Sequence, residues 1–178
     1  MDFFTVPTVF FKVLYVIVII SHERRVIKHF AITNHPTSAW VAQQLREATP
    51  FGLQPKYLIH DNDTIFVSKD LQEFLANSKI KSVKTGYRSP WQNGICERAV
   101  GILRRELLDH IIPFNENHLE YLLREYIFSY YNPTRTHQGI ERQTPLISEK
   151  PAKTSIAETS LTSDTLLGGL YHNYRKVA

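Results

Sequence analysis

The sequence predicts one mixed α/β domain, in which antiparallel strands come first and strands that alternate with helices follow. Three observations predict this class. Residues 1–35 are rich in Val, Ile, Phe and Thr, which is typical of strands. Further along the chain, apolar residues recur with helical spacing. The chain has 178 residues, 43% of them hydrophobic, which is enough for one domain with a sizeable core.

The N-terminal part is predicted to form three strands, at about 2–9, 12–20 and 25–32. The run Val13–Ile20 is apolar but shorter than the ~20 residues that a membrane-spanning helix needs. The chain opens with an acidic second residue and has no small-residue cleavage site after this run, unlike a signal peptide. We therefore expect a buried strand and no membrane association.

Helices and strands alternate after this region. The expected elements are a helix from Thr37 or Ser38 to Pro50, a strand at 57–60, a helix that starts at Ser68, a strand at 80–83, a helix at 93–110 and a helix at 117–131. Asn117 and Glu120 have the spacing of a capping box. Residues 1–145 are expected to form the folded core, and 146–178 a polar linker and C-terminal tail with a short strand or docking segment at 166–171.

The charge of the chain is mildly basic, with 21 Lys and Arg against 17 Asp and Glu. This balance permits a nucleic-acid partner without establishing one. Residues 79–110 hold seven basic and three acidic residues, so the local surplus equals that of the whole chain, +4. The one cysteine, Cys96, rules out a disulfide within the chain and suits a reducing cytoplasm.

Three carboxylates stand where a metal-dependent phosphodiester chemistry would need them. Asp2 precedes an apolar strand, Asp61 ends another, and Glu97 lies near the start of the long helix. Hard cations such as Mg²⁺ prefer oxygen ligands of this kind. Each residue alone has an ordinary explanation, as a turn residue or as a helix-start acid that meets the helix dipole. The combination is what indicates a site.

Four segments around these carboxylates carry a recognisable set of signatures. They are Tyr87–Arg98 (Y-x-S-P-x-x-N-G-x-x-E-R), His60–Phe66 (near D-N-G-x-x-F), Asp2–Thr5 (near D-x-T) and Tyr131–Gln138 followed by Thr144-Pro145. Between Asp61 and Glu97 lie 35 residues. This set resembles the catalytic cores of D-D-E transposases and retroviral-type integrases, and its last segment matches the bacterial insertion-sequence transposase branch.

The resemblance implies a ribonuclease H-like fold, a five-stranded mixed sheet flanked by helices, with a shortened first strand because Asp2 directly follows Met1. It implies that Asp2, Asp61 and Glu97 hold two Mg²⁺ or Mn²⁺ ions. Water or a DNA 3′-hydroxyl would then attack a phosphodiester in line, giving DNA strand transfer and integration. The implied partners are double-stranded DNA, as element ends and target, and further copies of the chain. The implied location is the bacterial cytoplasm, at the nucleoid when bound to DNA.

Seven residues near the proposed site are predicted to contact DNA. They are Lys84, Arg88, Trp91, Gln92, Asn93, Arg104 and Arg105. Ordinary roles stay open for these residues, such as an N-cap for Asn93, a loop anchor for Trp91 and a solvated helix face for the arginines. Arg98 is expected to form a structural ion pair, and Arg135 and His137 to cap or pack at least as much as to contact DNA.

Alternatives remain at the level of the residue and of the whole chain. Asp63 stands where the family usually has Gly, and it is expected to cap a turn, with competition against Asp61 as a ligand as the second possibility. The chain as a whole could be a non-catalytic DNA-binding remnant, since Asp2 at the edge of the chain would fray. It could also be a ribonuclease H-like nuclease, against which the ending at 131–145 argues.

Overall fold

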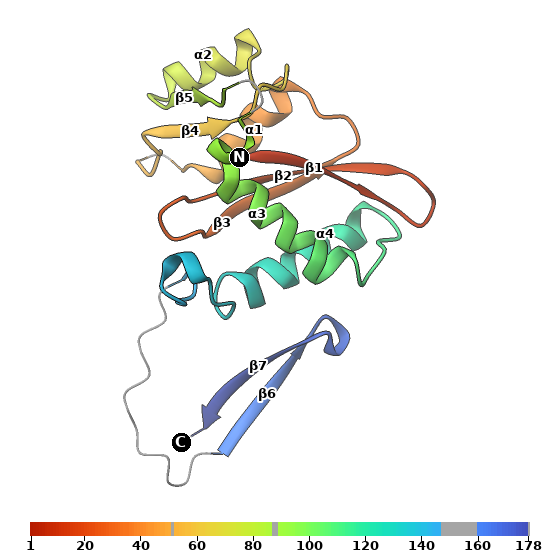
Figure 1. The fold of residues 1–178 in the computed structure, drawn as a ribbon. Helices are drawn as coiled ribbons and strands as arrows, with labels where there is room; N and C mark the ends of the chain where they lie inside the picture. Colours follow the sequence, from red (N-terminus) through yellow and green to blue (C-terminus); the bar gives the residue numbers. More distant parts are fainter. Residues whose placement is uncertain (51, 87–88, 147–159, 178) are drawn as a thin grey trace.

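The computed structural model describes residues 1–50, 52–86, 89–146 and 160–177, and its elements follow the predicted order (Figure 1). The elements are β1 (Asp2–Pro7), β2 (Val13–Ile20), β3 (Ile27–Thr33), α1 (Ser38–Ala48), β4 (Tyr57–His60), α2 (Lys69–Asn77), β5 (Lys81–Lys84), α3 (Gly94–Leu103), α4 (Glu116–Glu125), β6 (Ser160–Leu166) and β7 (Tyr171–Val177). The mixed α/β class predicted from the sequence is confirmed.

The five N-terminal strands are hydrogen-bonded in two parts. Strands β1, β2 and β3 form an antiparallel sheet, in which Asp2 lies opposite Val18. Strands β4 and β5 form a parallel pair. The backbone nitrogen of Met1 donates to the carbonyl oxygen of Ile59 at 2.7 Å, which brings the start of β1 beside β4. The expected mixed sheet is therefore present as two ladders joined at this point.

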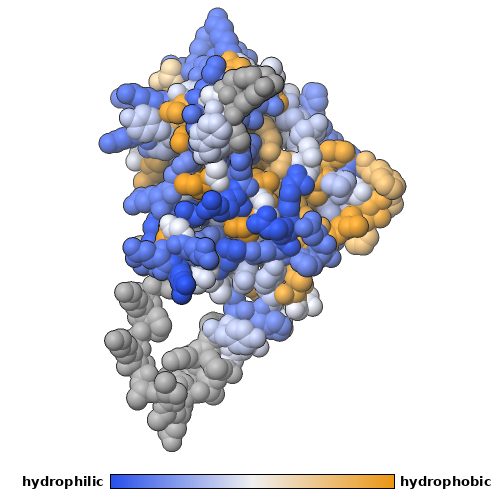
Figure 2. Space-filling model, in the orientation of Figure 1, coloured by the Kyte–Doolittle hydropathy of each residue, from blue (hydrophilic) through white to orange (hydrophobic). Residues whose placement is uncertain are grey.

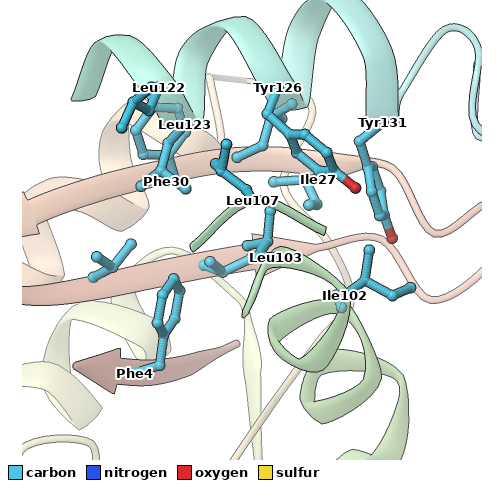
Figure 3. Packing of buried hydrophobic residues seen from close by; sticks show 14 of the residues in the cluster. Phe4, Ile27, Phe30, Ile102, Leu103, Leu107, Leu122, Leu123, Tyr126 and Tyr131 are labelled. Atoms are coloured by element: carbon cyan, nitrogen blue, oxygen red, sulfur yellow. The ribbon is translucent and has the colours of Figure 1, made fainter. Parts of the chain in front are cut away.

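Strand β2 is buried on both faces, which explains its unbroken apolar sequence. Val16 and Val18 pack into one core with α3 and α4, whereas Ile17 and Ile19 pack into a second core with α1 and α2. Figure 3 shows the first core, where Leu103 and Leu107 meet Leu122, Leu123 and Tyr126 from the α4 side. Helices thus cover both faces of the sheet.

The long helix expected at 93–110 has three parts. A short 3₁₀ turn at Pro90–Asn93 leads into α3, which continues as a π-helical segment, η2 (Arg104–Leu108). The amide of Asp109 donates to the carbonyl of Arg104 at 2.8 Å, the five-residue spacing of a π-turn. Cys96 and Leu107 are fully buried, so both ends of this composite helix contribute to the core.

The start of α4 differs from the sequence prediction. Asn115, and not Asn117, caps the helix, because its side-chain oxygen accepts a hydrogen bond from the amide of His118 at 2.9 Å. The ring of Phe114 stacks on the His118 ring, with centroids 5.1 Å apart. This contact, just before the cap, fixes the entry of the chain into the helix. Helix α4 then continues as the π-helical segment η3 (Tyr126–Tyr131).

The described part of the predicted tail is a hairpin that packs on the helices. Strands β6 and β7 pair antiparallel, and Leu167 between them is buried in the core. The Leu167 amide donates to the Glu125 carboxylate at 2.7 Å, and the Tyr171 hydroxyl donates to the Glu106 carbonyl at 2.6 Å. The docking segment expected at 166–171 is thus present.

Within the described ranges, no helix combines the length and the apolar character that crossing a membrane requires.

Candidate active site

The three predicted carboxylates come from three different elements that meet at one edge of the fold. Asp2 begins β1, Asp61 directly follows β4, and Glu97 lies in the first turn of α3. The hydrogen bond from Met1 to Ile59 places the first two next to each other. Helix α3 reaches the same edge through Asn93, which precedes its first residue.

Asp2 is a half-buried carboxylate whose negative charge is disfavoured. One oxygen accepts a hydrogen bond from the Phe3 amide at 2.8 Å, and the other accepts from the Asn93 side chain at 3.3 Å. Burial is the largest cause that raises the pKa of Asp2 to about 6, and the negative charges of Asp61 and Glu97 contribute to this rise. Asp61 and Glu97 are therefore both close enough to repel the charge of Asp2.

The side chain of Asn93 is buried beside Asp2. It is only 2% exposed, and its side-chain nitrogen donates to the Met1 carbonyl and to Asp2, both at 3.3 Å. Asn93 holds the N-cap position of α3, as expected, but its side chain makes no capping hydrogen bond to the helix. Burial contradicts the prediction that Asn93 touches DNA. Its side-chain oxygen is buried and has no partner among the described residues.

The two aspartates in the loop after β4 make different hydrogen bonds. A carboxylate oxygen of Asp61 accepts a hydrogen bond from the Asp63 amide at 3.1 Å. Asp63 in turn accepts from the Ile65 amide at 2.9 Å, so its carboxylate caps the turn, as expected. Asp63 is absent from the residues with positive φ, so the turn does not require the glycine that the family usually has there.

His60 is a structural residue that fixes the position of Asp61. It is fully buried, its Nδ1 donates to the Asp61 carbonyl at 2.7 Å, and its Nε2 pairs with the Ser82 hydroxyl at 2.8 Å. Since Nδ1 carries the proton, Nε2 accepts from Ser82. Burial lowers the pKa of His60, which keeps the ring neutral. Both ring nitrogens are occupied, so neither is available to a metal ion.

Glu97 is the exposed member of the three. Its carboxylate has no hydrogen bond or ion pair within the described part of the chain, so its oxygens are available to a ligand. No three Asp, Glu, His or Cys side chains of the described ranges are close enough together to form a ready-made metal site.

Known integrase proteins resemble this chain in sequence and in fold. Residues 78–145 match the family described as integrase core domain. A chain of the simian T-cell lymphotropic virus intasome, in complex with PP2A regulatory subunit B56 gamma, aligns with TM-score 0.66 and 18% identity over 98% of this chain and 64% of that chain. This chain thus spans less than two thirds of that relative. No curated protein matches.

Two integrase catalytic core domains align as well. That of HTLV-2, in complex with magnesium, has TM-score 0.59 and 17% identity over 81% of this chain and 89% of that chain. That of BIV has TM-score 0.54 and 17% identity over 81% and 88% of the two chains. The chain has the fold of an integrase core. The predicted resemblance and the ribonuclease H-like class are both confirmed.

The loop that enters α3 of this integrase-like core is held from within. The side-chain oxygen of Gln92 accepts a hydrogen bond from the Gly86 amide at 2.7 Å, which fixes Gln92 close to the end of β5. Trp91 is 73% exposed, so its ring does not anchor the loop by burial. Lys84 is exposed at the end of β5. Arg88, also predicted to contact DNA, lies outside the described residues.

The arginines of the composite helix point to two sides of the core. Arg104 donates to the Thr5 carbonyl at 3.2 Å, and its guanidinium lies 5.5 Å from the centre of the Phe4 ring, so it lies along β1. Arg105 lines a different cavity together with Arg98. The expected ion pair of Arg98 is wrong for the described part of the core, where it has none.

Arg135 has a partner that the sequence did not indicate. Its guanidinium makes two-pronged contacts with Glu106, with nitrogen–oxygen distances from 2.5 to 3.1 Å. The Tyr126 hydroxyl also donates to Glu106, at 2.6 Å. Burial alone would raise the pKa of Glu106, but the hydrogen bonds from Arg135 and Tyr126 outweigh it and lower that pKa. The packing role expected for Arg135 is therefore an ion pair that fastens 132–137 to η2.

The raised pKa of Asp2 leads to a prediction about stability. Its folded pKa of about 6 lies above the unfolded value of 3.8, so the folded state binds the proton more tightly. The free energy of unfolding should fall as pH rises from about 4 to about 6. Above that range Asp2 is ionised, and the loss of stability stays constant. Asp2→Asn should therefore stabilise the metal-free core near neutral pH by about 1–2 kcal/mol, less than the full shift because Asp2 is partly exposed.

Urea unfolding with EDTA, at about pH 4 and at about pH 7.5, measures this effect. The gain of the variant should vanish at the lower pH, where Asp2 of the wild type is protonated. A gain of equal size at both pH values would show that the disfavoured negative charge of Asp2 is not the cause.

Proposed function

We propose that this chain is the catalytic core of a mobile-element transposase that transfers DNA strands, with Asp2, Asp61 and Glu97 as its catalytic residues. The observation that carries the proposal is the convergence of three carboxylates from β1, the end of β4 and the start of α3, which lie close enough for two of them to raise the pKa of the third. Carboxylate oxygens are the ligands that divalent ions use at phosphodiester-processing sites.

The donor chemistry fits Mg²⁺ or Mn²⁺. Burial and the charges of Asp61 and Glu97 disfavour the charge of Asp2, and Glu97 has no protein partner in the described chain, so positive charge among these oxygens would stabilise all three. The HTLV-2 core domain with this fold is in complex with magnesium. We propose two ions held by Asp2, Asp61 and Glu97. When bound, such ions polarise the phosphodiester and lower the pKa of the attacking hydroxyl.

The protein's own residues would position these ligands. Asn93 donates to Asp2 and to the backbone of Met1, which fixes the start of β1 against α3. His60 donates a hydrogen bond to the Asp61 carbonyl and so fixes the backbone of Asp61. The attack would then come from water or a DNA 3′-hydroxyl, in line with the leaving oxygen, and no covalent protein intermediate is needed.

Exposed residues at the end of β5, in the loop before α3 and on the composite helix are proposed to bind duplex DNA. Lys84, Trp91, Gln92, Arg104 and Arg105 remain proposed contacts, together with Arg88 of the same loop. The positive charges would neutralise backbone phosphates. The related HTLV-2 core domain is described in dimeric and trimeric forms, and the simian virus chain belongs to an intasome. We propose that this chain also works as a homo-oligomer on paired DNA ends.

A joining assay tests the proposed function. The purified chain is incubated with labelled duplexes from the DNA that flanks its gene and with a plasmid target, in Mn²⁺, Mg²⁺ or EDTA. Joined products are expected with either metal and not with EDTA. Gel electrophoresis of the label on the plasmid measures joining, and duplex cleavage is read on the same gel.

The two alternative functions, a nuclease and a non-catalytic DNA-binding remnant, predict different outcomes of this assay. A ribonuclease H-like nuclease would give metal-dependent cleavage without joining. A non-catalytic remnant would bind the duplex, in a mobility-shift assay of the same samples, and yield neither product. Either result rejects strand transfer by this chain.

A further inference from the structure

A second group of charged residues lies outside the carboxylate site. A cavity of about 690 Å³ is lined by arginines from three separate segments. They are Arg25 from the turn between β2 and β3, Arg98 of α3, Arg105 of η2, and Arg135 and Arg142 from the segment after η3. We call this cavity the arginine pocket. Figure 2 shows strongly hydrophilic side chains in the middle of the face that α3 crosses, whereas the tip of the β1–β2 hairpin at the right is apolar.

Most of this positive charge has no carboxylate partner. Among the described residues, only Arg135 of the five has an ion pair, with Glu106. Arg25 makes one long hydrogen bond, 3.4 Å to the Gly139 carbonyl, and its Nε is buried without a partner. Like charges that line one cavity repel one another, and an anion in the cavity removes that cost.

His137 adds a neutral donor to the arginine pocket. It is 6% exposed, and its Nδ1 accepts a hydrogen bond from Arg135 at 3.3 Å. Since arginine can only donate, the proton of the neutral ring must be on Nε2. Burial, with Arg135 and Arg25 nearby, lowers the pKa of His137 to about 4, so the ring is neutral at physiological pH. Its Nε2 is buried and has no partner in the described chain.

Gly139 makes room for one of the arginines. A Cβ atom at this position would lie 2.0 Å from a terminal nitrogen of Arg25. The guanidinium of Arg25 therefore lies directly on the backbone of Gly139, where any side chain would displace it. This contact fixes one wall of the arginine pocket without using a charged partner.

We propose that the arginine pocket binds the phosphodiester backbone of duplex DNA, as a site separate from the three carboxylates. Planar guanidinium groups match phosphate oxygens with two parallel hydrogen bonds, which favours arginine over lysine at such sites. Several unpaired guanidinium groups in one cavity fit a polyanion, whose neighbouring phosphates supply more than one negative charge. A single small anion would leave part of this charge uncompensated.

The position of the arginine pocket agrees with DNA that also reaches the carboxylates. Arg98 follows Glu97 directly, and Arg105 lies about 12 Å from Glu97 along the helix axis, at about 1.5 Å per residue. Phosphates of one strand are spaced by about 3.4 Å along the duplex, so the pocket would hold the backbone about three to four nucleotides from the reacting phosphodiester. This distance along the DNA rests on the proposed function, whereas binding in the pocket does not.

Binding of a fluorescently labelled duplex, followed by anisotropy in EDTA over a range of salt concentrations, tests the inference. The double variant Arg98→Ala/Arg142→Ala should bind about 10- to 100-fold more weakly at low salt. The slope of log affinity against log salt should be smaller by about 2, because about one counterion is released per phosphate contact. The matched control is Arg46→Ala/Arg124→Ala, which removes the same charge from exposed positions on α1 and α4.

The control should bind within about threefold of the wild type. Equal weakening in the two double variants would mean a general charge effect and would overturn the inference. The inference would also be overturned if the wild type bound inorganic phosphate while the Arg98→Ala/Arg142→Ala variant kept the duplex affinity of the wild type. Because the assay needs neither metal nor joining, a chain that fails to join DNA can still pass this test.

Gly139→Ala provides a second variant that keeps every charge. It should displace the Arg25 guanidinium and weaken duplex binding by about three- to tenfold, with an unchanged far-UV circular dichroism spectrum. Unchanged duplex binding by a variant in which Arg25 has moved would show that the geometry of the arginine pocket does not matter.

Discussion

Glu97→Gln is expected to reduce DNA joining by about 10³-fold while leaving the fold and duplex binding intact. The substitution keeps the shape of the side chain and removes the negative charge that a divalent ion needs in its ligands. A loss of about 4 kcal/mol of transition-state stabilisation corresponds to this factor. Because the Glu97 carboxylate is exposed and has no partner among the described residues, no structural contact is lost. Initial rates of joining at saturating Mn²⁺ measure the effect.

Glu116→Gln is the matched control for this prediction. Glu116 is also an exposed acid in the first turn of a helix, α4, so both substitutions remove the same favourable interaction with a helix dipole. Joining by the Glu116 variant should stay within about twofold of the wild type. If Glu97→Gln retained most of the joining activity, Glu97 would not be a metal ligand, and the assignment of the catalytic carboxylates would have to be abandoned.

Elements that depend on local pattern were predicted well. The unbroken apolar run of β2 indicates burial on both faces, and the structure shows why, since alternate residues enter two different cores. Asp61 and Glu97 were identified by motif and spacing, and the fold brings both near Asp2. The role of Asp63 also followed from local chemistry, because an Asp at a turn tends to accept hydrogen bonds from the amides that follow it.

Features that depend on contacts between distant segments could not be predicted. Asn93 has the spacing of a helix cap, but its side chain bonds to Met1 and Asp2, more than 90 positions earlier. The arginine pocket joins residues from 25 to 142, and only the surplus of basic residues in 79–110 hinted at it. Such sites are defined by tertiary packing between distant segments. Composition and periodicity describe each segment separately and do not show which segments come together.

Asn132→Ala is expected to be the most destabilising substitution of a polar side chain in this core. Asn132 is 2% exposed, and its side chain both accepts from the Ile27 amide and donates to the Ile27 carbonyl, each at 3.0 Å. It thus takes the place of a neighbouring strand at the start of β3. Alanine would leave two buried backbone groups unpaired, at about 1–3 kcal/mol each. We expect a loss of about 3–5 kcal/mol in urea unfolding, or roughly 10 °C in Tm.

Two further substitutions separate lost hydrogen bonds from lost volume. Asn117→Ala, at an exposed helical position of α4, should change the free energy of unfolding by less than about 0.5 kcal/mol. Asn132→Asp preserves the volume but faces the Ile27 carbonyl with an acceptor unless it is protonated, so its folded pKa should be raised. Its deficit relative to the wild type should then be small below about pH 4 and should grow as pH rises through the folded pKa. Stability equal to the wild type at every pH would mean that the volume of the side chain, and not its bond to the Ile27 carbonyl, makes Asn132 important.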